Sequence, residues 1–222
     1  MTPFEFFRQI GLLVGLPTAI LAGAGAVLVV VPRDWRAVIF GYALQSVMLS
    51  VLLSRPLPAE WALLQMIVGG LVAVMMFLSA GELRGAARLG VPAPARWPQM
   101  ASLTSFRLLA AILAAVAFYI LRDRARLPEV DALFRDTIVW LVMFGILGIA
   151  LHTEPLHAGL SLLTMIGGFE LLLFTLNKNG AMVALVMAWQ LLLGLAIAYL
   201  ILARGLAPLH RDALADRMEG DV

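Results

Sequence analysis

The stretch from Asn179 to Ala203 reads NGAMVALVMAWQLLLGLAIAYLILA and contains no charged residue. An apolar run of about 18 residues or more is long enough to cross a bilayer as a helix. Its backbone must be helical, because the bilayer core offers no water to satisfy amide and carbonyl groups. The stretch therefore predicts a membrane-spanning helix, and it decides the class of the protein.

Other parts of the chain repeat this pattern. Hydrophobic residues make up 62% of the sequence and charged residues 14%, whereas a soluble domain carries roughly 25% charged residues. We predict an all-α polytopic membrane protein with about seven transmembrane helices. The predicted spans are 11–31, 37–53, 58–79, 103–121, 137–151, 157–176 and 182–203. Pro17 falls inside the first of them, where we expect it to kink the helix.

The polar connections divide the chain into four parts. Residues 1–81 form an N-terminal three-helix repeat, and 82–136 form a linker that contains one transmembrane helix. Residues 137–204 form a second three-helix repeat, and 205–222 form a polar tail. Basic residues are almost evenly split between the two sides of this arrangement. The slight excess favours a cytoplasmic C-terminus and an N-terminus outside.

A repeat at a fixed offset relates the two halves. Gln65, Gly69 and Ala73 share the pattern Q-x-x-x-G-x-x-x-A with Gln190, Gly194 and Ala198, and 190 − 65 = 125. Such spacing places the three residues along one helix face. Gln45 and Glu170 keep the same offset, since 170 − 45 = 125. Chance register in an apolar sequence is the alternative to a duplication.

A duplication would account for the additional helix at 103–121. A three-helix unit ends on the opposite side of the membrane from its start, so a second copy fused directly to it would be inverted. One extra helix returns the chain to the first side. We therefore predict two parallel three-helix repeats joined by an extra helix, an architecture known among membrane transporters.

Glu170 is the acidic residue that lies well inside a predicted span. A carboxylate at the bilayer centre costs about 2.5–3.5 kcal/mol on insertion scales, so it should face protein or water and have a partner. We consider it a candidate for a proton path, and a buried structural acid is the alternative. Gln190, Gln65 and Gln45 are further candidates, although an amide can also serve only to join helices. Gly69, Gly194, Ala73 and Ala198 are predicted to pack helices closely.

The remaining polar residues suggest little chemistry. Arg107 interrupts the span 103–121, and it either reaches the interface or pairs with an acid inside a complex. We include it among the proton path candidates. His152 and His157 flank a turn without a third ligand in the sequence, so we expect a titratable interfacial pair and no metal or cofactor. No cysteine is present to bind zinc or an iron–sulfur cluster. A net charge of +2 does not favour a nucleic acid partner.

Residues 137–204 resemble the K subunit of NADH-quinone oxidoreductase and the related C subunit of Mrp-type antiporters. The K subunit carries I-G-L-E in its second helix and A-E-A-x-x-G-L-A in its third. The counterparts here are IGGFE at 166–170, with one inserted residue, and AWQLLLGLA at 188–196. Gln190 stands at the place of the third-helix glutamate, so one of the family's two paired charges is missing.

The whole chain, with a degenerate first repeat, resembles hydrogenase-4 component E. The resemblance implies an accessory membrane subunit of a complex I-like proton-translocating assembly, with antiporter-like membrane subunits as partners. It also implies the inner (plasma) membrane of a prokaryote, an N-terminus outside and a cytoplasmic C-terminus. A purely structural membrane scaffold and an independent small-solute transporter are the alternatives.

Overall fold

The computed structural model describes residues 15–88, 104–122, 124, 130–177 and 179–219. Within these ranges the regular structure is entirely helical. Six helices are long and apolar enough to cross a membrane, and α2 is a shorter apolar helix. The protein is therefore a multi-pass helical membrane protein, as predicted. The helices are α2 (Leu16–Val30), α3 (Trp35–Leu53), α4 (Ala59–Arg88), α5 (Thr104–Leu121), α6 (Ala132–Leu151), α7 (Pro155–Leu176) and α8 (Gly180–Glu219).

Short polar turns set where these helices begin. The Asp34 side chain accepts a hydrogen bond of 3.2 Å from the backbone N–H of Arg36, which caps the N-terminus of α3. Asn179 Oδ1 accepts one of 3.0 Å from the N–H of Ala181 and caps α8 in the same way. Pro155 occupies the first turn of α7, where its missing N–H costs no helical hydrogen bond.

Pro17 differs from its prediction. It lies in the first turn of α2, which starts at Leu16, so it begins this helix and does not kink its interior. The ring fixes φ near the helical value and has no N–H to satisfy, which suits a first turn. Residues 11–14 of the predicted first span lie outside the described part of the chain.

Three helices extend far beyond the predicted spans. α4 continues to Arg88 and α6 begins at Ala132, so both reach into the predicted linker. α8 continues to Glu219 and includes most of the predicted polar tail. Leu, Ala, Arg and Glu are good helix formers, so a helix can continue beyond its apolar section. Hydrophobicity therefore predicted the apolar section of each helix but not the full length of α4, α6 and α8.

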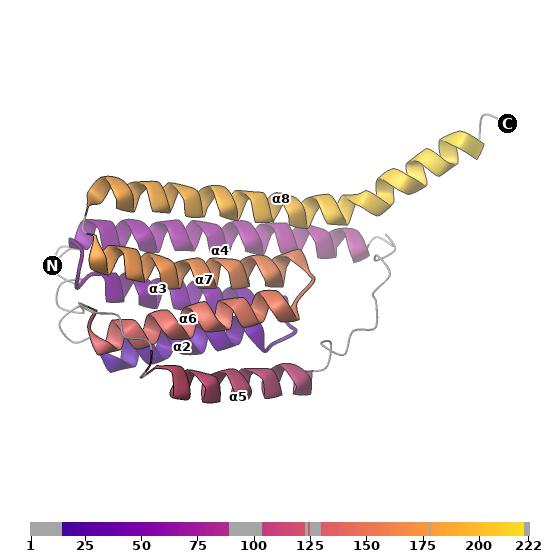
Figure 1. Cartoon of the computed structure of the whole chain (residues 1–222). Helices are drawn as coiled ribbons and strands as arrows, with labels where there is room; N and C mark the ends of the chain where they lie inside the picture. The colour runs from indigo at the N-terminus through magenta and orange to yellow at the C-terminus, as the bar shows by residue number, and fades with distance from the viewer. Residues whose placement is uncertain (1–14, 89–103, 123, 125–129, 178, 220–222) are drawn as a thin grey trace.

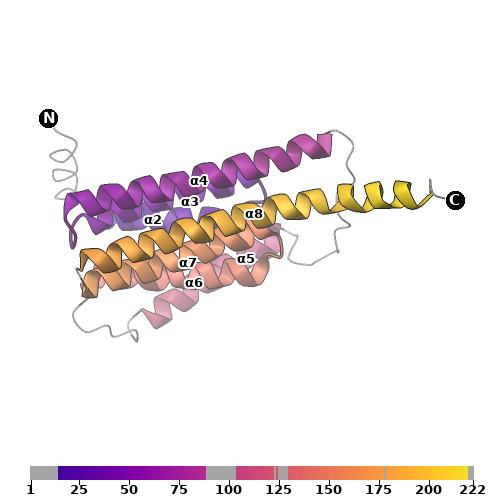
Figure 2. The same cartoon turned by 90° about the horizontal axis from the view of Figure 1, so that it is seen from above.

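The helices form a bundle in which successive helices run in opposite directions (Figure 1). α2, α4, α6 and α8 therefore share one direction, and α3, α5 and α7 share the other. Across the bundle α2 contacts α6, α3 contacts α7 and α4 contacts α8 (Figure 2). Each helix of the first half thus lies beside its counterpart in the second half and runs the same way. This confirms the predicted parallel arrangement.

Small residues let neighbouring helices approach closely, both within one half and between the halves. A Cβ atom added at Gly25 of α2 would lie 2.7 Å from the Gly41 carbonyl oxygen of α3. One added at Gly194 of α8 would lie 2.9 Å from the Val72 side chain of α4. A methyl group does not fit at such distances, so these contacts depend on glycine. Ala73 and Ala198 are buried in the core that α3, α4, α7 and α8 share.

The extra helix α5 packs at the periphery of the bundle. It contacts α6 through an edge-on pair of rings, with Phe118 and Trp140 centroids 5.0 Å apart. The Trp140 indole in turn donates a hydrogen bond of 3.1 Å to the Gly23 carbonyl of α2. Most of α5 stays exposed to the surroundings of the bundle.

Two adjacent glycines of α4 provide a test of this packing. A Cβ atom added at Gly69 would fall on the Ser46 hydroxyl of α3, whereas one at Gly70 meets no atom within 4 Å. We expect Gly69→Ala to lower the stability of the purified chain by about 1–3 kcal/mol through overpacking. Gly70→Ala should leave it unchanged or raise it by up to about 1 kcal/mol, since alanine is the better helix former. Thermal unfolding in detergent measures both, and equal midpoints would contradict the assigned interface.

Candidate functional site

Glu170 lies on α7 and is 1% exposed. It precedes the last residue of that helix, Leu176, by six positions (176 − 170 = 6), which corresponds to about 9 Å along the axis. The carboxyl group is therefore inside the membrane-spanning section and enclosed by protein. This is the position that the sequence predicted for it.

The amide of Gln65, on α4, holds this carboxyl group. Gln65 Nε2 donates a hydrogen bond of 2.8 Å to Glu170 Oε2 and one of 3.0 Å to Gln190 Oε1 on α8. Both amide hydrogens are thus used, and one side chain joins three helices. Gln65 and Gln190 occupy equivalent positions in the two halves. The cluster therefore lies where the two halves of the bundle meet.

Tyr42 of α3 completes the cluster and was not anticipated. Gln190 Nε2 donates a hydrogen bond of 3.3 Å to the Tyr42 hydroxyl, and the tyrosine side chain is 2% exposed. Its position offered one signal, because Tyr42 precedes Gln45 by nearly one helical turn and shares its face. The resulting chain of contacts runs Glu170, Gln65, Gln190, Tyr42 and involves α7, α4, α8 and α3.

Gln45 is close to this chain but bonds elsewhere. Its Oε1 accepts a hydrogen bond of 3.1 Å from the Thr164 hydroxyl of α7. Perfect symmetry would pair Gln45 with Gln190, as Glu170 pairs with Gln65. In the structure the Gln190 Nε2 group instead donates its hydrogen bond to Tyr42. The two halves therefore share one backbone arrangement and differ in their polar contacts.

Two acceptor atoms of the cluster are buried without a hydrogen-bond partner among the described residues. They are Oε1 of Glu170 and Oε1 of Gln65. A buried polar atom without a partner costs about 1–3 kcal/mol. A carboxyl group can take up and release a proton. An amide cannot, but it can orient the carboxyl group by hydrogen bonding. The cluster thus combines one proton-carrying group with neutral groups that position it.

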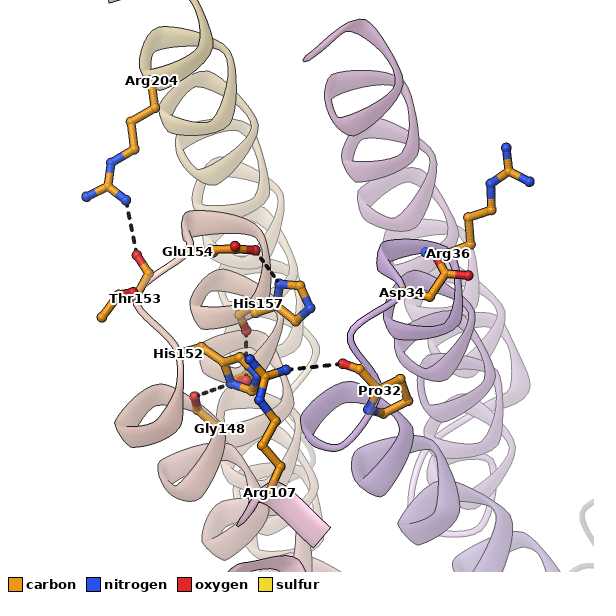
Figure 3. A network of polar contacts seen from close by, with 11 residues as sticks. Pro32, Asp34, Arg36, Arg107, Gly148, His152, Thr153, Glu154, His157 and Arg204 are labelled. Atoms are coloured by element: carbon orange, nitrogen blue, oxygen red, sulfur yellow. Dashed lines mark hydrogen bonds and ion pairs between the residues drawn. The ribbon is translucent and has the colours of Figure 1, made fainter. Parts of the chain in front are cut away.

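Arg107 is not part of this cluster. It lies at the opposite edge of the bundle, where its guanidinium donates a hydrogen bond of 3.5 Å to the Pro32 carbonyl at the end of α2 (Figure 3). Arg107 is in the first turn of α5, and a long side chain there can reach the polar edge of the membrane. Of the two sequence interpretations, the described contact agrees with the interfacial one.

A second cluster of polar side chains lies at this edge of the bundle, beside Arg107. The rings of His152 and His157 stack with centroids 4.8 Å apart and planes 14° from parallel. His152 Nδ1 lies 2.8 Å from the Gly148 carbonyl, so it carries the proton and donates. Glu154 lies 3.3 Å from His157 Nδ1. Figure 3 shows these residues beside Arg107, with Arg204 reaching over to the Thr153 carbonyl.

Burial lowers the pKa of His152 from 6.5 to about 4, and the neighbouring His157 and Arg107 act in the same direction. The hydrogen bond to Gly148 and the charge of Glu154 oppose this shift without cancelling it. The imidazole is therefore neutral at neutral pH, and its Nε2 is buried without a hydrogen-bond partner in the described ranges.

The part of the chain that the structure describes contains no group of three or more His, Cys, Asp or Glu side chains placed to hold a metal ion. His152 and His157 contact each other directly at this edge of the bundle. Comparison of the chain with protein-family models, with curated proteins and with solved structures gives no match.

A double-mutant cycle tests the central contact. Gln65→Leu and Glu170→Leu should each destabilise the purified chain by about 1–3 kcal/mol, since each leaves a buried polar partner unsatisfied. The double variant should lose less than the sum, by a coupling energy of about 0.5–2 kcal/mol. Unfolding in detergent measures all four proteins. Strict additivity of the two single effects would contradict the contact.

The histidine edge predicts a pH dependence of stability. The pKa of His152 is about 4 in the folded chain, against 6.5 for a histidine in water, so the unfolded chain binds more protons between these values. Stability should be constant above pH 6.5 and fall as the pH drops toward 4. His152→Asn keeps a donor for the Gly148 carbonyl but does not titrate, so this variant should lose part of the dependence. Melting curves recorded across this pH range give the comparison, and identical slopes would refute the assignment.

Proposed function

We propose that this chain is an accessory, non-catalytic membrane subunit of a complex I-like proton-translocating assembly, in which Glu170 contributes to a buried proton path. The assembly would be of the hydrogenase-4 or formate-hydrogenlyase type, or a related redox or antiporter complex. The observation that carries the proposal is a carboxyl group enclosed at span depth and held between the two halves by Gln65.

The geometry supports a proton-handling role in three respects. Glu170 is a titratable group whose second oxygen has no hydrogen-bond partner in the described part of the chain. Gln65 orients it through a direct hydrogen bond, and Gln190 and Tyr42 continue the chain of hydrogen bonds behind Gln65. Intramembrane acids of this kind commonly mark proton relays in membrane proteins. The resemblance of 137–204 to the K subunit places a glutamate of that family at the same position.

The outer surface is compatible with a place inside a larger assembly. α8 exposes Leu185, Trp189 and Leu192, each more than half exposed, and these would face lipid or a neighbouring subunit. We propose antiporter-like membrane subunits as the partners. We also propose the inner (plasma) membrane of a prokaryote as the location, with the N-terminus outside and the C-terminus in the cytoplasm.

A purely structural role is the second candidate. It is favoured by the same amide, because Gln65 joins α4 to both α7 and α8 and would hold the halves together without moving protons. Under this alternative, Glu170 matters for assembly and not for transport. An independent small-solute transporter receives less support, since the polar side chains of the cluster hydrogen-bond mainly to one another.

Replacement of Glu170 distinguishes these roles. Glu170→Gln keeps the size and hydrogen-bonding capacity of the side chain but removes its ability to ionise. We expect proton transport by the tagged, intact complex in inverted membrane vesicles to fall at least several-fold. The subunit composition after mild-detergent purification should not change.

Glu60→Gln serves as the matched control, because Glu60 is an exposed acid in the first turn of α4. It should leave both readouts at the wild-type level. Normal proton transport in Glu170→Gln together with normal assembly would remove the relay role. Loss of subunits from the purified Glu170→Gln complex would support the structural alternative.

A further inference from the structure

An apolar groove runs along the outer side of the bundle between α3 and α4. Its volume is about 340 Å³, which lies within the range of small-molecule sites in proteins. The groove is open to the surroundings, since Phe40, Val74 and Phe77 are at least half exposed. It faces the bilayer and not the polar cluster. Its walls are Ile39, Phe40 and Ala43 from α3 and Ala73, Val74 and Phe77 from α4.

Arg36 marks one end of this groove. It also lines the groove and lies in the first turn of α3. Phe40 and Ala43 follow it by four and seven positions, so the three side chains share one face of the helix. The groove therefore extends from Arg36 toward the bilayer interior by about 10 Å, the rise of seven helical residues.

The surroundings of Arg36 are typical of the headgroup level of a membrane. Its guanidinium carbon lies 5.4 Å from the ring centroid of Trp35, and this ring lies 5.2 Å from that of Phe77. Tryptophan and arginine at the end of a span are common at the membrane interface. The nearby Asp34 carboxylate caps the helix through the Arg36 N–H, and Figure 3 shows the Arg36 side chain directed away from it.

We infer that this groove binds one anionic phospholipid, with its phosphate at Arg36 and an acyl chain along the apolar walls. Two observations commit the site to this occupant. The groove opens toward lipid in a membrane-spanning protein, and the cation stands at the end where a headgroup would lie. A guanidinium binds phosphate oxygens through charge-assisted hydrogen bonds. The inference does not depend on the proposed proton path, because the groove lies on the outer surface.

The test uses the intact chain and two lipids with identical acyl chains. The purified protein is exchanged into detergent with phosphatidylglycerol or phosphatidylcholine, and the retained lipid is counted by native mass spectrometry. Phosphatidylglycerol should be retained and phosphatidylcholine should not. Arg36→Gln should weaken phosphatidylglycerol retention about fivefold, the factor that corresponds to about 1 kcal/mol for one arginine near an anionic lipid surface.

Two further variants make the result specific. Ala43→Leu keeps Arg36 and fills the groove, so it should also reduce retention. Arg122→Gln is the matched control, because Arg122 likewise stacks on an aromatic ring, with its guanidinium carbon 4.7 Å from the Tyr119 centroid, but does not line this groove. It should retain the lipid as the wild type does.

Three outcomes would overturn the inference. The first is unchanged retention in Arg36→Gln, and the second is equal retention of both lipids by the wild type. The third is a protein cross-link from a photoreactive residue at position 40 in the intact complex, together with the absence of lipid. That result would assign the groove to a helix of a partner subunit.

Discussion

The contact between the Gln65 amide and the Glu170 carboxyl group is the interaction on which the rest of the interior depends. A carboxyl group inside a membrane span must find its partner in the protein, because lipid offers none. Gln65 supplies that partner from the other half of the chain and at the same time bonds to Gln190. The polar requirement of one side chain therefore specifies how α4, α7 and α8 meet. The apolar contacts around them, which lipid could replace, specify this less strongly.

The two halves share a backbone plan but divide the polar roles unequally. Gln65 bonds to Gln190, its counterpart at the offset of 125, so these two residues join the two halves. Glu170 and Gln45 are counterparts with different partners, Gln65 for one and Thr164 for the other. A titratable group therefore stands in one half and an amide at the corresponding position of the other.

The polar chemistry of the chain is distributed over separate levels of the membrane. The Glu170 cluster is inside the spans, whereas the histidine pair with Arg107 lies at one edge (Figure 3). The groove at Arg36 lies on the outer surface between α3 and α4. Glycine and serine contacts such as that between Gly69 and Ser46 bring the helices close enough to enclose the cluster. Close packing at these few positions therefore keeps the interior separate from the lipid-facing surface.

Uninterrupted apolar runs in the sequence located the helices and their apolar sections, because the bilayer sets the length of a crossing helix. The offset between Gln65 and Gln190 also predicted the parallel halves and located most of the cluster. Only the tertiary structure decided which polar groups meet. Periodicity places a residue on a helix face but does not state which helix covers that face. The sequence therefore did not identify Tyr42 as a member of the cluster, and it did not show that Arg107 lies apart from it. The helix ends at Arg88 and Glu219 also escaped prediction, because hydrophobicity reports the bilayer and not the length of the helix.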